Sequence, residues 1–426
     1  MTPPANIAQP RTPESEPMSA ISTSAEDFRF FDADNHIYEP PEALLEHLPG
    51  KFAGKIRFLR DGKRDVISIQ SRTIDYIPNP TFAVVAAPGS FARYYSANNP
   101  EGLSLREMAG DPIRPLPAFQ NDREARLALL DEQGVDRVFV YPTLANLVEQ
   151  SVHDDPELTH AIIHSLNEWL HETWSFDFHD RIYMVPVLTL GMVDKAIEEL
   201  EWVLERGARA ILIRPAPPEG LRGHRSFGLP EFDPFWARVQ EAELPVCIHA
   251  AHSIIEGYVQ LWEPDGVTSA FNRSAFHGVA KGHRDIHDAI ASLICHGTLT
   301  RFPALRIASV ENGADWVAPL VHALDRSYRM EPQLHAEHPL DVLRRNVYVS
   351  PFWEDNLRAV CDLIGVERIM FGSDFPHPEG LANPREYLEQ LEGFTDDEKR
   401  LILHDNAARF VGPARKEKPS EMVKAD

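Results

Sequence analysis

Cysteine and long apolar runs are scarce in this chain. Its 426 residues include three cysteines, Cys247, Cys295 and Cys361. They form no Cys-x-x-Cys pair, and their odd number argues against a disulfide framework, so we expect a reducing compartment. No apolar run approaches the about 20 residues that a membrane-spanning helix needs, and the N-terminus lacks a basic-then-apolar signal pattern. These absences predict a cytoplasmic protein without a membrane partner.

Positive charge is also scarce. The sequence has 42 Lys and Arg against 65 Asp and Glu, a formal net charge of −23 at pH 7. It contains no basic cluster interleaved with aromatic residues, which makes nucleic acid and anionic membranes poor partners. The hydrophobic content of 43% is sufficient for a large core. We therefore expect the partner to be a small-molecule substrate.

The chain divides into one long domain and two terminal segments. Residues 1–25 carry five prolines together with Ser, Thr and Glu, which predicts a disordered N-terminal segment. Residues 26–412 form the predicted domain, and residues 413–426 a flexible charged tail. Within the domain, residues 51–120 are rich in Pro, Gly and aromatic side chains, which predicts an irregular, lid-like insertion.

From residue 121 onward, helical segments alternate with short apolar runs. The helix predicted at 122–132 ends at Gly134, and the one at 155–174 begins at Asp155-Pro156. The predicted strands are residues 28–40, 136–143, 182–190, 208–215, 244–250, 305–312, 346–352 and 368–376. Eight such units predict a (β/α)8 TIM barrel of the α/β class, with a long insertion after the first strand. A doubly wound sheet is the alternative, but no Gly-x-Gly-x-x-Gly follows the first strand.

The first predicted strand carries an acidic pattern. Asp32, Asp34 and His36 occupy every second position, so in a strand they share one face. Carboxylates and an imidazole that converge in this way would repel and desolvate each other unless a cation lay between them. The pattern alone is also compatible with a solvated turn.

The predicted barrel places chemistry at the C-terminal ends of its strands, and those ends are polar. The polar residues there are Asp34, His36, Arg214, His249, Glu311, Ser350, Trp353, Asp374 and His377. Because histidines and aspartates from several strands meet at one rim, a shared metal ion is favoured over independent structural roles.

The order of these motifs resembles a known family. Asp34-x-His36, His249 and the segment GSDFPH at residues 372–377 are similar to the amidohydrolase superfamily, in the family 2 branch typified by aminocarboxymuconate-semialdehyde decarboxylase. The segments ERGARAILIRP (205–215) and TRFPALRIASVENGADW (300–316) extend the resemblance, which spans residues 28–412. It implies a metal-dependent (β/α)8 barrel without an organic cofactor that hydrolyses small substrates or decarboxylates aromatic and related acids.

The resemblance also implies a ligand set. One divalent ion would be held by Asp34, His36, His249 and Asp374, and we expect zinc. Asp34 stands where the family commonly has histidine, and a second carboxylate makes the site harder, so manganese is the alternative. A further departure is Glu311, which stands where decarboxylase members place a histidine.

Three residues are predicted to be catalytic: Asp374, Glu311 and His377. Asp374 would take a proton from a metal-activated water, and Glu311 or His377 would return it to the leaving group. Glu311 could instead hydrogen-bond its own turn, and His377, which precedes Pro378, could instead shape one.

Substrate contacts are predicted for Arg214, His252 and Trp353. Arg214 could bind a substrate carboxylate through both arms of its guanidinium, or could form an ion pair that braces the rim. We expect a metal-dependent hydrolase that acts on a small carboxylate-bearing or aromatic substrate. A metal-dependent decarboxylase and a catalytically inactive ligand-binding barrel are the alternatives, and we expect a homodimer or higher homo-oligomer.

Overall fold

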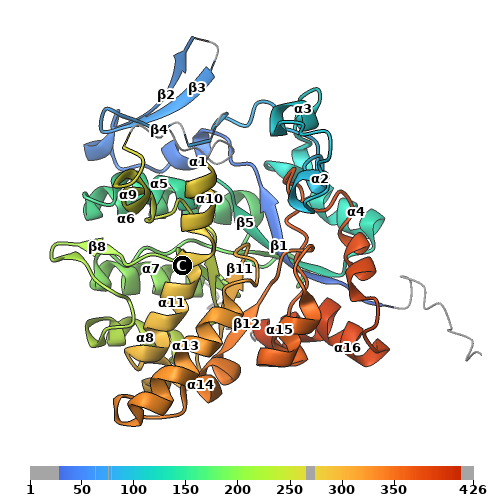
Figure 1. Ribbon diagram of the computed structural model, residues 1–426. Coiled ribbons are helices and arrows are strands. Elements are labelled where there is room, and N and C mark those ends of the chain that lie inside the picture. Colours follow the sequence, from blue (N-terminus) through green and yellow to red (C-terminus); the bar gives the residue numbers. More distant parts are fainter. Residues whose placement is uncertain (1–27, 63, 75, 78, 265–273, 414–426) are drawn as a thin grey trace, which may run out of the picture.

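The computed structural model describes residues 28–62, 64–74, 76–77, 79–264 and 274–413. The predicted disordered segment 1–25 lies outside the described residues, as does the predicted tail apart from residue 413. Helices surround a central group of strands (Figure 1).

Two parallel sheets form the interior. The first, in the order β1-β5-β6, comprises β1 (Phe31–Ile37), β5 (Arg137–Pro142) and β6 (Ile182–Met184). The second, in the order β12-β11-β10-β7, comprises β7 (Ile211–Ile213), β10 (Val246–His249), β11 (Ile307–Val310) and β12 (Val347–Val349). All pairs are parallel, and every strand residue except Arg137 is buried. Burial of both faces is typical of parallel sheets covered by helices, and the α/β class is confirmed.

Single parallel bridges connect the two sheets at both edges. They pair Val187 with Leu212 at one edge, and Val349 with Ile369 and Asn35 with Phe375 at the other. The predicted eighth strand, residues 368–376, therefore forms bridges but no continuous strand. Its extended backbone is interrupted by Asp374, whose φ of 56° lies in the left-handed region.

The predicted helices that follow the strands are present with the expected ends. The Asp122 side chain accepts a hydrogen bond from the Ala125 N–H at 2.9 Å at the start of α4 (Arg123–Gln133), which ends at left-handed Gly134. Asp155 caps α6 (Pro156–Trp174) in the same way.

The remaining helices have the following bounds. The α-helices are α1 (Glu42–Leu45), α2 (Ala92–Tyr95), α3 (Leu105–Ala109), α5 (Ala145–Val152), α7 (Val193–Glu205), α8 (Asp233–Glu241), α9 (Glu256–Gln260), α10 (Ala275–Lys281), α11 (Arg284–Cys295), α12 (Thr298–Arg301), α13 (Val317–Met330), α14 (Pro339–Asn346), α15 (Leu357–Ile364), α16 (Asp396–Arg400) and α17 (Asn406–Val411). Short 3-10 helices are η2 (Gly50–Phe52), η3 (Pro117–Phe119), η4 (Pro230–Phe232), η5 (Pro332–Leu334), η6 (Val366–Arg368) and η7 (Pro384–Leu391), and η8 (Leu401–Asp405) is a π-helix.

Residues 51–120 are more regular than the sequence predicts. They contain an antiparallel sheet of β2 (Ile56–Asp61), β3 (Arg64–Ile69) and β4 (Arg72–Ile74), which stands at the top of Figure 1. Ile67 and Ile69 are fully buried, and Ile69 pairs with Ile56. This alternation of apolar residues is a strand signal that the prediction of an irregular insertion overlooked.

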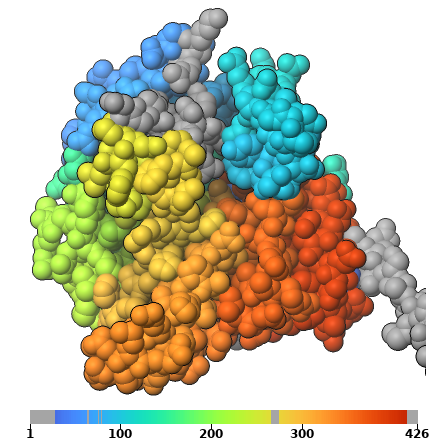
Figure 2. All heavy atoms as spheres, viewed as in Figure 1, coloured from blue at the N-terminus to red at the C-terminus, as the bar shows by residue number. Residues whose placement is uncertain are grey.

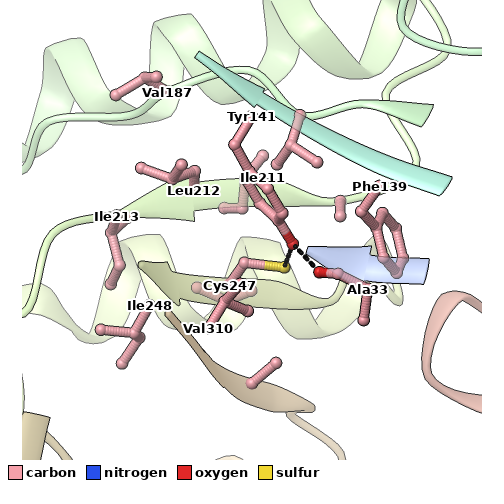
Figure 3. Close-up of a cluster of buried hydrophobic side chains, with 14 of the residues drawn as sticks. Ala33, Phe139, Tyr141, Val187, Ile211, Leu212, Ile213, Cys247, Ile248 and Val310 are labelled. Carbon is pink, nitrogen blue, oxygen red and sulfur yellow. Dashed lines mark hydrogen bonds between the residues drawn. The ribbon is translucent and has the colours of Figure 1, made fainter. Parts of the chain in front are cut away.

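A tyrosine hydroxyl lies among the buried side chains of the parallel sheets. Tyr141 reaches inward from β5, and its hydroxyl donates a hydrogen bond to the Ala33 carbonyl at 3.2 Å and lies 3.2 Å from Cys247 Sγ (Figure 3). A buried tyrosine hydroxyl needs such partners, and these fix the ring beneath the strand ends.

Two further features lie outside the sheets. A short hairpin, β8 (Glu219–Gly220) and β9 (Gly223–His224), follows β7. Among the described residues, no helix is both long and apolar enough to cross a membrane.

Candidate metal centre

Five polar side chains meet where the parallel strands end. His36 Nε2 lies 3.4 Å from Asp34 Oδ1, 3.1 Å from Glu311 Oε2 and 3.5 Å from Asp374 Oδ1. His249 Nε2 lies 3.2 Å from His36 Nε2 and 3.2 Å from Glu311 Oε2. The structure thus brings together the four residues predicted as metal ligands.

Glu311, predicted to be a proton donor, also belongs to the group of possible metal ligands. The ligand atoms of Asp34, His36, His249 and Glu311 all lie within 4.8 Å of one another. A second such group joins His36 and Glu311 to Asp374 and His377. Glu311 contacts the Nε2 atoms of both histidines, so its position suits a ligand as well as a proton donor.

The atoms that converge here fit a cation. The Ala250 carbonyl lies 2.9 Å from His249 Nδ1 and can only accept, so Nδ1 carries a proton and Nε2, which faces the cluster, is the nitrogen that could bind a metal. Asp34 Oδ1 is buried and has no hydrogen-bond partner among the described residues. Carboxylate oxygens and imidazole lone pairs that face one another at this depth form a binding site for a divalent metal.

The ionisation of the cluster reflects its excess of negative charge. Burial alone would lower the pKa of His36, but contacts with Asp34 and Glu311 outweigh burial and raise it to about 9. Burial, followed by the charge of Glu311, raises the pKa of Asp374 well above its usual range. The carboxylates therefore attract protons in the place where a metal ion would supply positive charge.

Asp374 and His377 form a pair that shares a proton. Asp374 Oδ1 lies 2.7 Å from His377 Nδ1, and His377 Nε2 lies 2.9 Å from the Thr143 hydroxyl. That hydroxyl donates its only proton to the Ile37 carbonyl at 2.7 Å, so it must accept from His377 Nε2–H. One proton then lies between Asp374 and His377 Nδ1, in direct contact with the metal-ligand cluster.

The backbone at the two carboxylates is held in an uncommon conformation. Glu311 and Asp374 have φ angles of 54° and 56°, in the left-handed region that few non-glycine residues adopt. The Asp374 N–H donates to the Asp34 carbonyl at 2.8 Å, which fixes the turn against β1.

Asp32 supports this turn rather than binding the ion. Its carboxylate accepts hydrogen bonds from the Ser373 N–H at 2.9 Å, the Ser373 hydroxyl at 2.5 Å and the Asn35 amide at 2.8 Å. The expectation that Asp32 shares a face with Asp34 and His36 is wrong, because the register of β1 shifts between Asp32 and Asn35. Burial raises the pKa of Asp32 to about 7, although these hydrogen bonds act to lower it.

The cluster opens into a cavity of about 1100 Å³. Residues of the 51–120 segment line it, including Tyr76, Phe82, Phe91, Tyr95 and Arg106. In the space-filling view, the residues near 100 (cyan) and helix α10 (yellow) lie at the same end of the molecule (Figure 2). The predicted substrate residue Trp353 also lines the cavity, and its indole N–H donates to the Glu379 carbonyl at 3.3 Å.

The other two predicted substrate residues lie elsewhere. His252 is not among the residues that line the cavity; its ring stacks on Tyr76 at 4.2 Å, and burial lowers its pKa to about 4. Arg214 lines a separate small cavity, where it hydrogen-bonds to Gln150 beside Glu149. Arg214 therefore lies outside the lining of the large cavity, and both its contact with a substrate carboxylate and its alternative role in an ion pair stay predictions.

Sequence reasoning missed the cations that do line the large cavity, Arg106 and Lys281. Both belong to segments outside the strand and helix alternation, where no motif marks a site. It also missed Thr143, whose position directly after β5 is the one available signal.

Comparison with known proteins gives consistent matches. The profile of the family described as Amidohydrolase matches residues 115–412. The 2-amino-3-carboxymuconate-6-semialdehyde decarboxylase of Dictyostelium discoideum is 25% identical over 131 residues, which are 29% of this chain and 36% of that protein. The gamma-resorcylate decarboxylase of Rhodococcus jostii (strain RHA1) is 26% identical over 306 residues, 67% of this chain and 86% of the relative.

Solved structures match over nearly the whole chain. An amidohydrolase from Mycobacterium avium subsp. paratuberculosis K-10 superposes with a TM-score of 0.86 at 38% identity, over 91% of this chain and 100% of the other. A dihydroxybenzoic acid decarboxylase from Polaromonas sp. JS666, with bound manganese and the inhibitor 2-nitroresorcinol, has a TM-score of 0.54 at 16% identity, over 90% of this chain and 97% of the other. The second likeness concerns the fold alone.

Proposed function

This chain belongs to the amidohydrolase family, and on that premise we propose that it is a metal-dependent decarboxylase of an aromatic or related carboxylic acid. The family match confirms the resemblance found in the sequence and supports the prediction of an enzyme. Both curated relatives are decarboxylases by name, which favours the decarboxylase alternative over the expected hydrolase.

The proposed architecture is a (β/α)8 barrel. The two parallel sheets and the bridged segment 369–375 would be its wall, and residues 51–120 would be a lid over its mouth. The parallel bridges at both sheet edges and the aromatic residues that this segment contributes to the cavity support the proposal.

The proposed metal ligands are Asp34, His36, His249 and Asp374, with Glu311 added because of its contacts with both histidines. A bound divalent ion would supply positive charge that orients a substrate carboxylate and an adjacent ring oxygen. Three carboxylates form a hard site, and the Polaromonas decarboxylase contains manganese, so we propose manganese ahead of the zinc expected from the sequence.

The shared proton of Asp374 and His377 is the observation that carries the proposed reaction. Loss of carbon dioxide from an aromatic acid breaks the bond between the ring and the carboxylate, and the ring carbon must gain one proton in exchange. The pair holds that proton at a 2.7 Å hydrogen bond in the wall of the cavity. Thr143 accepts from His377 Nε2–H, which fixes this tautomer and leaves Nδ1 facing the proton that it shares with Asp374.

The cavity suggests the size and charge of the substrate. Its about 1100 Å³ is at or above the upper end of ordinary ligand pockets, about 300–1,000 Å³. Aromatic side chains such as Tyr95 and Trp353 would flank an aromatic ring, while Arg106 and Lys281 would meet an additional anionic or polar group. We therefore propose an aromatic acid that carries a substituent beyond a single ring.

Carbon dioxide release tests the proposal. The manganese-loaded enzyme should release carbon dioxide from at least one acid in a panel of substituted hydroxybenzoates, and Asp374→Asn should slow the release about 10²-fold or more. A panel that yields only hydrolysis products of matched esters and amides would refute decarboxylation.

Metal-dependent hydrolysis is the second candidate because of one residue. Glu311 stands where decarboxylases of this branch are expected to have histidine, and a carboxylate there could accept a proton from an attacking water. Retention of the whole ligand set argues against an inactive binding barrel. The homo-oligomeric state and the cytoplasmic location stay predictions, as does the absence of nucleic acid and membrane partners.

A further inference from the structure

A second group of metal-ligating side chains lies far along the chain from the first. His153 directly follows α5, whereas Glu219 and His224 belong to the β8–β9 hairpin. One ligand atom from each of the three lies within 4.8 Å of the others, and none of the three belongs to the strand-end cluster. We propose that they form a second metal site, for zinc or a similar divalent ion that accepts imidazole ligands.

The hairpin fixes two of the three ligands before any ion binds. Glu219 and His224 are cross-strand partners, so their side chains project from the same face. A side chain on Gly220 would meet the Gly191 carbonyl oxygen at 2.3 Å, so this close approach holds the hairpin against the body of the protein. The position of Glu219 is therefore set by backbone packing.

The orientation of His224 suits a ligand. Its Nδ1 lies 3.4 Å from the Pro217 carbonyl, which can only accept, and its Nε2 lies 3.4 Å from Glu219 Oε2. An imidazole whose far nitrogen faces a carbonyl offers the other nitrogen to a metal, as in many zinc sites. His153 approaches the same Glu219 oxygen through Nδ1.

The site has room for a further ligand. Two histidines and one carboxylate are a common protein set for a zinc ion that keeps an open position. The three side chains border a cavity of about 20 Å³, enough for one water molecule. Arg214, which borders the same cavity, donates a hydrogen bond to Gln150, and its positive charge is attracted to the carboxylate of Glu149.

An ion at this site would join α5 to the hairpin. Gln150 of α5 binds Arg214, so the same ion would brace the region around that buried guanidinium. This role is independent of the proposed decarboxylase reaction, because the site shares no residue with the strand-end cluster.

Zinc stoichiometry in variants tests the proposal. Metal-free full-length protein is dialysed against micromolar zinc, and bound zinc is measured by emission spectrometry. Wild type should bind two equivalents, one at each cluster, and the double variant His153→Gln, His224→Gln should bind one. His249→Ala should retain one equivalent, held by the second site, whether or not the protein is a decarboxylase.

A matched control separates this site from an ordinary histidine and glutamate pair. His164 Nδ1 lies 2.7 Å from Glu199 Oε2, and this pair belongs to none of the metal-ligating groups among the described residues, so His164→Gln should still bind two equivalents. Melting temperatures in chelator should agree among the variants, which would show that the hairpin is intact. A double variant that binds as much zinc as wild type, or a His249→Ala variant that binds none, would overturn the second site.

Discussion

The strand-end cluster and the segment that overlies it are built in different ways. Asp34, His36 and His249 are 4%, 1% and 3% exposed and stand on buried parallel strands. The 51–120 segment leaves apolar side chains such as Tyr94 and Leu116 at 39% and 51% exposure. We propose that the rigid framework of parallel strands holds the chemistry, whereas the 51–120 segment, a more open cover, selects the substrate.

Removal of a framework ligand should have the largest effect. In His249→Ala, the remaining strand-end ligands should no longer retain their ion, so total bound metal should fall from two equivalents to the one held by the second site. The value of kcat/KM should fall at least ~10³-fold, equivalent to about 4 kcal/mol of transition-state stabilisation. Metal analysis and steady-state kinetics check both values. The control His164→Ala should leave activity unchanged. Metal content equal to that of wild type in His249→Ala would show that the assignment of the strand-end site is wrong.

Loss of the shared proton should have the next largest effect. Asp374→Asn keeps the shape and one oxygen ligand of the side chain but cannot hold the acidic proton. We expect kcat to fall about 10²-fold or more, while metal content falls less than in His249→Ala. Rapid-quench assays of the metal-loaded variant measure this directly. A kcat near wild type would show that the proton comes from elsewhere.

The sequence predicts part of the fold and of the strand-end cluster, but not all of either. The strands and capped helices follow from local patterns, such as Asp122 and Gly134 at the two ends of α4. The ligand cluster follows because parallel strands end at one rim. The register shift that turns Asp32 away from the ion depends on pairing between β1 and β5, which no local pattern encodes.

The cover was harder to predict for a physical reason. Arg106 of this segment, like Lys281 of α10, reaches the cavity through tertiary packing and carries no local signal. The placement of the Arg214 side chain also depends on tertiary packing: it follows a strand, as predicted, but it hydrogen-bonds to Gln150 and lines a separate small cavity.

Replacement of Thr143, which positions His377, should have an intermediate effect. Thr143→Val removes the acceptor for His377 Nε2–H and loses about one hydrogen bond, about 1 kcal/mol, so kcat should fall ~5-fold. Thr143→Ser keeps the hydroxyl and should restore most of the activity. Parallel melting curves would expose a merely structural loss, and equal kcat in the two variants would contradict the positioning role.

Replacement of a residue in the 51–120 segment should have the smallest effect. It should change KM rather than kcat. Tyr95→Ala removes one aromatic wall of the cavity and should raise KM about 2–5-fold with little change in kcat, because ring contacts contribute about 0.5–1 kcal/mol. Hydrogen exchange over residues 76–112 should slow when a nitro-substituted phenol analogue binds. Equal exchange with and without analogue would argue against a lid.

The origin of the new C–H bond tests the central claim most directly. A turnover in D2O with an accepted aromatic acid should yield product with one deuterium at the carbon that carried the carboxylate, together with one carbon dioxide per product molecule. Both should form about 10²-fold more slowly in Asp374→Asn. A product that retains its carboxylate and gains the elements of water would contradict decarboxylation and identify the enzyme as a hydrolase.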